Sequence, residues 1–173
     1  MPLTTNSLPY PAASDIPDVP HDIQALAEAI NPYAKSPVWG FYGRTANQAI
    51  ATGQYIGVIG TQIAMEGGLV LNAATGQVTI PVGGLYLLNG WATWNANATG
   101  ARFVNWARNN TILVRVQGLA TAASLLTQSC MKVTRLAAGD KLDWQVWQSS
   151  GVALALDGNA NYPTGYDIIR LAP

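Results

Sequence analysis

The sequence predicts an all-β domain over residues 37–173, preceded by a proline-rich arm and one short helix within residues 1–36. From Trp39 onward, short strand-like runs are separated by Gly, Asn and Pro, and no helical period is present. The composition and residue pattern of the sequence also change sharply near residue 36, where the arm ends. Regularly spaced short strands of this kind are typical of an antiparallel sandwich or barrel.

The arm begins with an extended segment. Residues 8–20 contain four of the 10 prolines of the chain. Proline fixes φ and lacks a backbone donor, so this run cannot join a central strand. A helix is then expected over residues 20–30, with Asp18 as its N-cap and Asn31-Pro32 as its stop. Its apolar stripe is Ile23, Leu26, Ala27 and Ile30.

A helix of about 11 residues is marginal alone in water, so this stripe must pack on another surface. That surface could be the β domain, symmetry copies of the helix, or a larger particle. We predict attachment to a particle, with the contact made by Tyr10, Pro11, Ile23, Leu26 and Ile30.

Ten strands are expected in the β domain. Their ranges are 38–45, 54–65, 68–71, 76–82, 84–95, 101–107, 111–117, 124–137, 140–148 and 164–172. In the run 140–148, Leu142, Trp144 and Val146 alternate with Lys141, Asp143 and Gln145. This alternation predicts one face in the core and one in water.

The run 84–95 is apolar on both faces. Leu85, Leu87 and Trp91 share one face, and Tyr86, Leu88 and Trp94 share the other. A two-sided apolar strand in a small antiparallel domain suggests that another subunit covers it, although a loop could also do so. We predict a homotrimer with Tyr86 and Leu88 at its interface.

Two motifs resemble a known family. Residues 76–86, Gly-Gln-Val-Thr-Ile-Pro-Val-Gly-Gly-Leu-Tyr, resemble the Gly-x-Phe-x-x-Pro-x-x-Gly-x-Tyr signature of complement-type globular heads in the tumour necrosis factor superfamily. Val78 replaces the usual aromatic residue. Residues 136–142, Leu-Ala-Ala-Gly-Asp-Lys-Leu, resemble the family's Leu-x-x-Gly-Asp-x-Val/Leu turn.

Asn109-Asn110 and residues 166–171 sit where the family has a turn and its last strand. The resemblance covers about residues 40–172. It implies a ten-strand antiparallel jelly-roll sandwich that assembles as a compact homotrimer.

The arm resembles a different group of proteins. Tyr10-Pro11, Asp15, Asp18-Val19 and the run 22–29 (Asp-Ile-Gln-Ala-Leu-Ala-Glu-Ala) are similar to the start of minor tail proteins of actinobacterial and related phages. This resemblance implies a virion component that is made in a host cytoplasm. The start of the chain shows no basic and apolar signal segment, and no apolar run approaches the roughly 20 residues of a membrane span.

Composition and charge exclude several classes of function. Only 10% of residues are charged, against roughly 25% in typical domains, which suits either burial in an assembly or polar but uncharged strand faces. The formal net charge is +0, so the sequence shows no excess of positive charge that would indicate nucleic-acid binding. The arm has a net charge of −3 (Lys35 against Asp15, Asp18, Asp22 and Glu28), which leaves +3 on the β domain.

Catalytic and cofactor chemistry is not predicted. His21 is the one histidine and Cys130 the one cysteine, so neither a catalytic triad nor a zinc site can be assembled. Cys130 alternates with apolar residues and is expected to be a buried, inert thiol. Asp140 and Asp143 form the most obvious carboxylate pair, but one belongs to a turn and the other to a strand face in water. A calcium site at Asp157 would have a single carboxylate, and a plain turn is the simpler interpretation.

Three functions remain. The chain could be a trimeric tail or fibre protein that binds a host surface, most simply a glycan. It could be a purely structural virion protein, such as a capsid decoration or baseplate plug without a ligand. A secreted cytokine-like head is the third class. We predict the first.

Strand direction indicates where binding would occur. Alternating antiparallel strands place both ends of the jelly roll together, so the loops 95–100, 118–123 and 149–163 lie at the opposite end. Amides and aromatic rings suit sugars, although asparagine also simply forms turns. The predicted receptor-binding residues are Trp94, Asn95, Asn97, Asp157, Asn159, Asn161 and Tyr162.

Overall fold

The computed structural model describes residues 23–28, 37–121 and 124–173 of the chain. Residues 37–172 form one compact unit, and residues 1–36 with Pro173 form a second. Of the predicted helix, residues 23–28 are described and are helical. Gln24 Nε2 donates a hydrogen bond to Glu28 Oε1 over 2.8 Å along this helix. No helix in the described ranges has the length and apolar character needed to cross a membrane.

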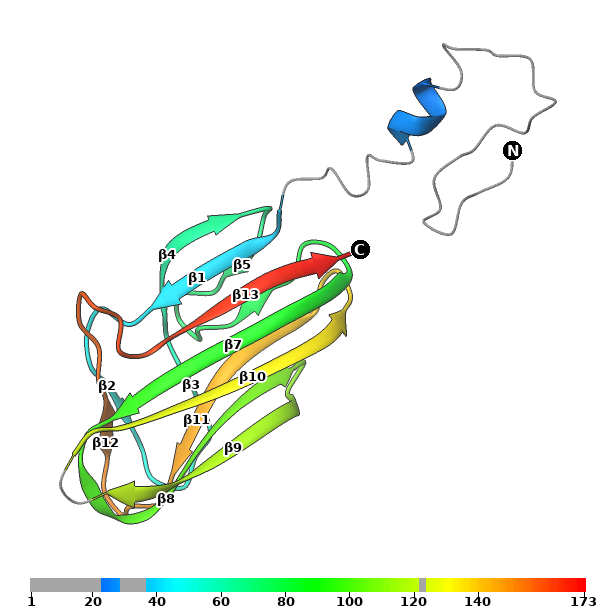
Figure 1. Ribbon diagram of the computed structural model, residues 1–173. Coiled ribbons are helices and arrows are strands. Elements are labelled where there is room, and N and C mark those ends of the chain that lie inside the picture. The colour runs from blue at the N-terminus through cyan, green and yellow to red at the C-terminus, as the bar shows by residue number, and fades with distance from the viewer. Residues whose placement is uncertain (1–22, 29–36, 122–123) are drawn as a thin grey trace. The chain divides into compact units, whose positions relative to one another are not determined.

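The β unit is a sandwich of two antiparallel sheets, which confirms the predicted fold class (Figure 1). The first sheet has the order β2-β12-β7-β13-β1-β4, and β10 pairs with β7. Its strands are β1 (Trp39–Gly43), β2 (Gln48–Ile50), β4 (Thr61–Glu66), β7 (Gly84–Trp94), β10 (Leu126–Leu136), β12 (Leu154–Leu156) and β13 (Gly165–Ala172).

The second sheet has the order β5-β6-β11-β8-β9, and β3 pairs with β11. Its strands are β3 (Ile56–Gly57), β5 (Val70–Leu71), β6 (Val78–Thr79), β8 (Asn97–Arg108), β9 (Thr111–Thr121) and β11 (Lys141–Gln148). β2 and β12 were not predicted; each has three residues and they pair with one another.

The predicted strand 54–65 is instead two strands in different sheets. β3 pairs with β11 in the second sheet, whereas β4 pairs with β1 in the first. Between them, the Gly60 amide donates to the Val58 carbonyl in a tight bend. A side chain at Gly60 would come within 3.0 Å of Tyr42 Cβ, so the glycine lets the chain cross the core from one sheet to the other.

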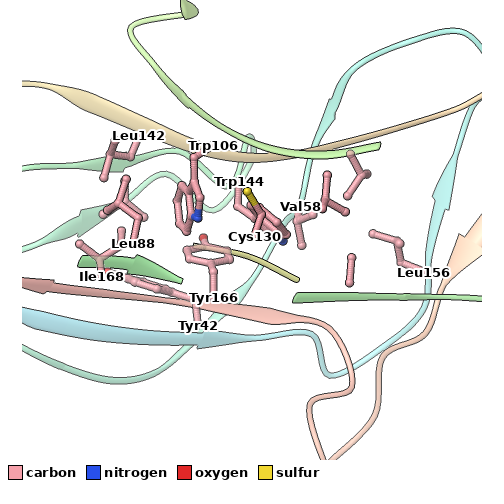
Figure 2. Packing of buried hydrophobic residues seen from close by; sticks show 14 of the residues in the cluster. Tyr42, Val58, Leu88, Trp106, Cys130, Leu142, Trp144, Leu156, Tyr166 and Ile168 are labelled. Carbon is pink, nitrogen blue, oxygen red and sulfur yellow. The ribbon is translucent and has the colours of Figure 1, made fainter. Parts of the chain in front are cut away.

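The core between the sheets is built around aromatic rings (Figure 2). Tyr166 stacks on Tyr42 with ring centroids 4.8 Å apart, and the edge of Trp106 meets Tyr166 at 5.7 Å. Trp144 lies 5.3 Å from Trp106. Cys130 is buried in the same core, as predicted, and burial raises the pKa of its thiol. The core aromatics come from both sheets and therefore join them.

Both ends of the β unit lie at the same end of the sandwich, as strand direction predicted (Figure 1). The start of β1 pairs with the end of β13, and the Arg170 amide donates to the Val38 carbonyl. We call this the near end, and the opposite end the far end.

The two sequence motifs meet at the near end. The Ile80 amide donates to the Asp140 carbonyl over 2.9 Å, and the Gly139 amide donates to the Ile80 carbonyl over 2.8 Å. The Tyr86 hydroxyl donates to the Val82 carbonyl over 2.6 Å. The predicted turn at Asn109-Asn110 is also present there, with φ of 49° and 67°.

Candidate binding surfaces

The outward face of the first sheet is largely apolar. Leu87 faces Val133 on β10 and Ile169 on β13, so three apolar side chains form a row across three strands. The exposed fraction is 49% for Val133 and 62% for Met131, which lies two residues earlier on β10. Large apolar side chains in neighbouring strands form a continuous patch that water solvates poorly. We call this surface the first-sheet face.

Aromatic rings extend this face towards the far end. Phe41 on β1 stacks with Trp91 on β7 at 6.0 Å, and Tyr162 meets Phe41 edge-on at 5.5 Å. Trp91 Nε1 donates a hydrogen bond of 3.0 Å to the Tyr162 carbonyl. Tyr162 has a φ of 52°, in the left-handed region that non-glycine residues seldom adopt. The loop therefore turns Tyr162 against the first-sheet face.

One polar pair interrupts the first-sheet face. Asn89 Nδ2 on β7 donates to Asp167 Oδ2 on β13 over 3.2 Å. The other cross-strand neighbour of Asp167 is Phe41, so no charged residue lies directly opposite it. Burial raises the pKa of Asp167, and the hydrogen bond from Asn89 opposes this with a smaller effect. A partner that covers this face would bury the Asp167 carboxyl further and would raise its pKa more.

The prediction that Tyr86 and Leu88 form the trimer interface is wrong. Both are 0% exposed and belong to the core between the sheets. In β7 the even-numbered residues point inward, and Leu85, Leu87 and Trp91 point outward. The two faces of this strand are both apolar, so the sequence pattern could not tell which of them is inside. An interface would use the odd-numbered face.

Trp94 is also not available for ligand binding. It is 0% exposed, and its indole Nε1 donates to Gln128 Oε1 over 2.9 Å. The guanidinium of the buried Arg102 lies 5.8 Å from the Trp94 ring. Trp94 is an even-numbered residue of β7, so it faces the interior with Tyr86 and Leu88. We correct the prediction that its ring forms an exposed stacking surface.

The remaining predicted receptor-binding residues lie at the far end, in two adjoining segments. The Asn95 amide donates to the Ala155 carbonyl, and the Asp157 amide donates to the Thr93 carbonyl. Asn97 belongs to β8 and not to a loop. Asn95 and Asp157 are half-buried, whereas Asn159 and Asn161 are exposed.

Two of these asparagines form turns. Asn97 Oδ1 accepts from the Thr99 amide over 2.8 Å, and Asn159 Oδ1 accepts from the Asn161 amide over 2.8 Å. Each is an Asx turn, in which the side chain replaces a backbone acceptor. Each side-chain Oδ1 therefore already accepts one of its two possible hydrogen bonds, and the side-chain NH₂ groups offer further donors.

The predicted attachment residues fall largely outside the described part of the chain. Tyr10, Pro11 and Ile30 lie outside it. Ile23 and Leu26 belong to the helix over residues 23–28, where they are 62% and 42% exposed.

The two candidate catalytic carboxylates have separate structural roles. Asp140 Oδ2 accepts from the Ala137 amide, and its Oδ1 accepts from Asn109 Nδ2 over 2.7 Å. Asp143 is only 6% exposed, which corrects the prediction that it faces water, and it accepts from Gln77 Nε2 over 3.0 Å. Burial raises the pKa of Asp143, and this hydrogen bond lowers it by less. Within the described ranges, no group of three His, Cys, Asp or Glu side chains could hold a metal ion.

The first-sheet face was not singled out from the sequence, although a signal for it exists. Trp39 and Phe41 alternate with the small residue Gly40 and the buried Tyr42 on β1. This alternation marks a second apolar face on the strand beside β13. Combined with the odd-numbered residues of β7, it could have shown that a second apolar face exists, but not which of the two faces points outward.

Comparisons with known proteins agree with the architecture. Eiger TNF from S. frugiperda matches with a TM-score of 0.61 at 14% identity, over 80% of this chain and 94% of that chain. Murine APRIL, crystallised at pH 8.0, matches with a TM-score of 0.62 at 15% identity, over 79% of this chain and 100% of that chain. No family model matches the sequence.

One sequence relative is an uncharacterised protein of Acanthamoeba polyphaga mimivirus, 31% identical over 78 residues. The match covers 45% of this chain, and the chain spans about 30% of the length of that relative. The β unit therefore has the TNF-like jelly-roll fold, as the two sequence motifs predicted.

Proposed function

We propose that the protein is a non-enzymatic, homotrimeric virion component that binds a host surface. Three copies pack through the first-sheet face, the arm attaches the trimer to the particle, and the far end meets the receptor. The observation that carries the proposal is the first-sheet face itself, where Leu87, Met131, Val133 and Ile169 leave apolar area uncovered in a single chain.

The physical argument for self-association is the cost of that apolar area in water. Burial yields about 25 cal/mol per Å² of apolar surface, and interfaces between identical subunits are richer in apolar residues than the remaining surface. The resemblance to trimeric globular heads and the TNF-like fold support three copies as the assembly.

The virion role is supported by the similarity of residues 10–29 to phage minor tail proteins and by the mimivirus relative. The arm is a separate unit with an apolar helix face, which suits a docking segment. The far end points away from the place where the arm joins β1, so it is the end that a receptor would reach (Figure 1).

Light scattering tests the assembly. The purified chain should have a mass of about three times 18.3 kDa. Val133→Glu should dissociate the trimer, because it would place a charge in the buried centre of the interface. Val152→Glu is the matched control, since Val152 is similarly exposed (56% against 49%) but lies in a far-end loop. A wild-type monomer at micromolar concentration would refute the trimer.

Adsorption to host cells tests the far end. Ala98→Gln and Ala160→Gln add neutral volume at exposed far-end positions without removing an Asx turn, and both should reduce adsorption. Ala138→Gln makes the same change in the near-end turn and should have no effect. Full adsorption by the Ala98→Gln, Ala160→Gln double variant would favour the purely structural role.

A further inference from the structure

The outward face of the second sheet carries a cluster of aromatic rings at its far end. Trp147 on β11 lies 5.1 Å from Phe103 on β8 and 6.3 Å from Tyr55, which precedes β3. Tyr55 is 44% exposed, and the other two rings are half-buried. In both β8 and β11, the neighbouring residues Val104 and Val146 point into the core, so the rings stand on the outer side.

An arginine from the edge strand completes this cluster. The Arg115 guanidinium carbon lies 5.1 Å from the Tyr55 ring and 5.4 Å from the Phe103 ring. Arg115 is exposed, and within the described ranges no hydrogen bond or ion pair engages its guanidinium. We call Tyr55, Phe103, Arg115 and Trp147 the Arg115 patch.

No carboxylate of the described β domain pairs with Arg115. The five carboxylate side chains of the β domain are those of Glu66, Asp140, Asp143, Asp157 and Asp167. Glu66 accepts from Trp39, Asp140 from Asn109, Asp143 from Gln77 and Asp167 from Asn89. Asp157 lies in the segment that follows β12 in the other sheet. The β domain carries a net +3, and no carboxylate in the described ranges forms an ion pair with Arg115, although Asp143 lies on β11 two residues before Gln145.

A buried acceptor adjoins the patch. Asn105 follows Phe103 by two residues on the same face of β8 and faces Arg115 on β9 and Gln145 on β11. Its Nδ2 donates to Gln145 Oε1 over 3.0 Å, but its Oδ1 is buried without a partner. Asn105 is 0% exposed although it points outward, so the side chains around it cover it. A buried acceptor without a donor destabilises the protein, and a ligand hydroxyl could supply the missing hydrogen bond.

We propose that the Arg115 patch binds an acidic sugar, a pyranose ring that carries a carboxylate. The C–H face of the ring would stack on the aromatic side chains, and the carboxylate would take two parallel hydrogen bonds from the Arg115 guanidinium. A ring hydroxyl would supply the missing donor to Asn105 once the Arg115 side chain turns towards the ligand. This inference rests on the receptor-binding part of the proposed function and names its ligand class and its site.

Titration calorimetry on the full chain tests the proposal. The probe is an oligosaccharide that contains glucuronic acid, and the comparison is the same oligosaccharide with its carboxyl groups reduced to alcohols. The wild-type protein should bind the acidic form and should bind the reduced form at least about tenfold more weakly, because the reduced form lacks the charge-assisted pair. Binding should also perturb tryptophan fluorescence, since Trp147 lies in the patch.

The variants separate the patch from general electrostatics. Arg115→Gln should weaken binding of the acidic form about tenfold or more, and Arg115→Lys should recover part of it, since lysine keeps the charge without the planar fork. Tyr55→Leu should weaken both forms. Lys141→Gln is the matched control: it removes one exposed positive charge from β11 at the near end and should leave affinity unchanged.

Several outcomes would overturn the proposal: no binding of the acidic form, equal affinity for the reduced form, unchanged affinity in Arg115→Gln, or equal losses in Arg115→Gln and Lys141→Gln. The patch lies within one chain, so a monomeric protein would contradict the proposed trimer without affecting this test. A trimer that adsorbs to host cells but fails to bind the acidic sugar would contradict only this inference.

Discussion

Gly90 of β7 lies directly beneath the indole of Trp144 on β11. A Cβ built on Gly90 would stand 2.6 Å from Trp144 Cδ2, well inside contact distance. The Trp144 ring therefore packs against the backbone of the opposite sheet and lies beside Trp106 (Figure 2). Because Gly90 has no side chain, the Trp144 ring packs directly against the β7 backbone at the centre of the core.

Gly90→Ala should therefore destabilise the domain by about 1–3 kcal/mol, the usual effect of forcing a core side chain from its position. Chemical denaturation would measure the change. Gly83→Ala is the control, because its Cβ would come no closer than 3.4 Å to a neighbour. Equal stability of the two variants would show that Trp144 can move at little cost.

Arg102 is expected to be essential for the structure of the far end. It is 1% exposed, and its guanidinium donates to the carbonyls of Thr99, Ala101 and Asn97. Arg102→Met retains much of the packing volume but leaves these acceptors without a donor. We expect a loss of about 1–3 kcal/mol in the free energy of unfolding. Hydrogen exchange should show reduced amide protection around residues 97–102 in the variant. Protection equal to that of the wild type there would contradict this role.

Asp167 should make stability depend on pH. Burial raises its pKa in the folded state above the ordinary 3.8, so folding binds the proton more tightly. The corresponding stability is complete below the unfolded pKa and is lost as pH rises through the folded pKa. Asp167→Asn should match the wild type in acid and be more stable near neutral pH. Melting temperatures between about pH 3 and pH 7 would measure this difference.

Asn89→Ala should change the pH dependence of stability in the direction opposite to Asp167→Asn. Without the hydrogen bond from Asn89, the pKa of Asp167 should rise further, so the loss of stability towards neutral pH should be larger than in the wild type. If the Asp167→Asn and wild-type profiles are parallel over the whole range, Asp167 does not carry the pH dependence.

Deletion of residues 1–36 should leave the fold and the trimer intact but abolish incorporation into particles. The β unit from residue 37 to 172 contains the whole aromatic core, and the arm belongs to a separate unit. The melting temperature of the truncated protein and its abundance in purified particles are the two measurements. Unfolding of the truncated chain would show that the arm contributes to the core.

The sequence alone determined those features that depend on neighbouring residues. The alternation in 140–148 correctly placed Leu142, Trp144 and Val146 inside, because a strand has a period of two and only one of its faces was consistently apolar. The motifs at 76–86 and 136–142 predicted the jelly roll through their resemblance to the tumour necrosis factor superfamily, and the fold agrees with that resemblance.

Only the tertiary structure decided which of two apolar faces is buried. Both faces of 84–95 satisfy the period, so the choice between Tyr86 and Leu87 depends on what the opposite sheet presents, here the large ring of Trp144 over Gly90. The Arg115 patch is likewise a feature that only the tertiary structure decided. Tyr55, Phe103, Arg115 and Trp147 are far apart in the sequence, and they meet because β3, β11, β8 and β9 lie side by side in one sheet. Strand order is set by long-range pairing, which local sequence patterns do not encode.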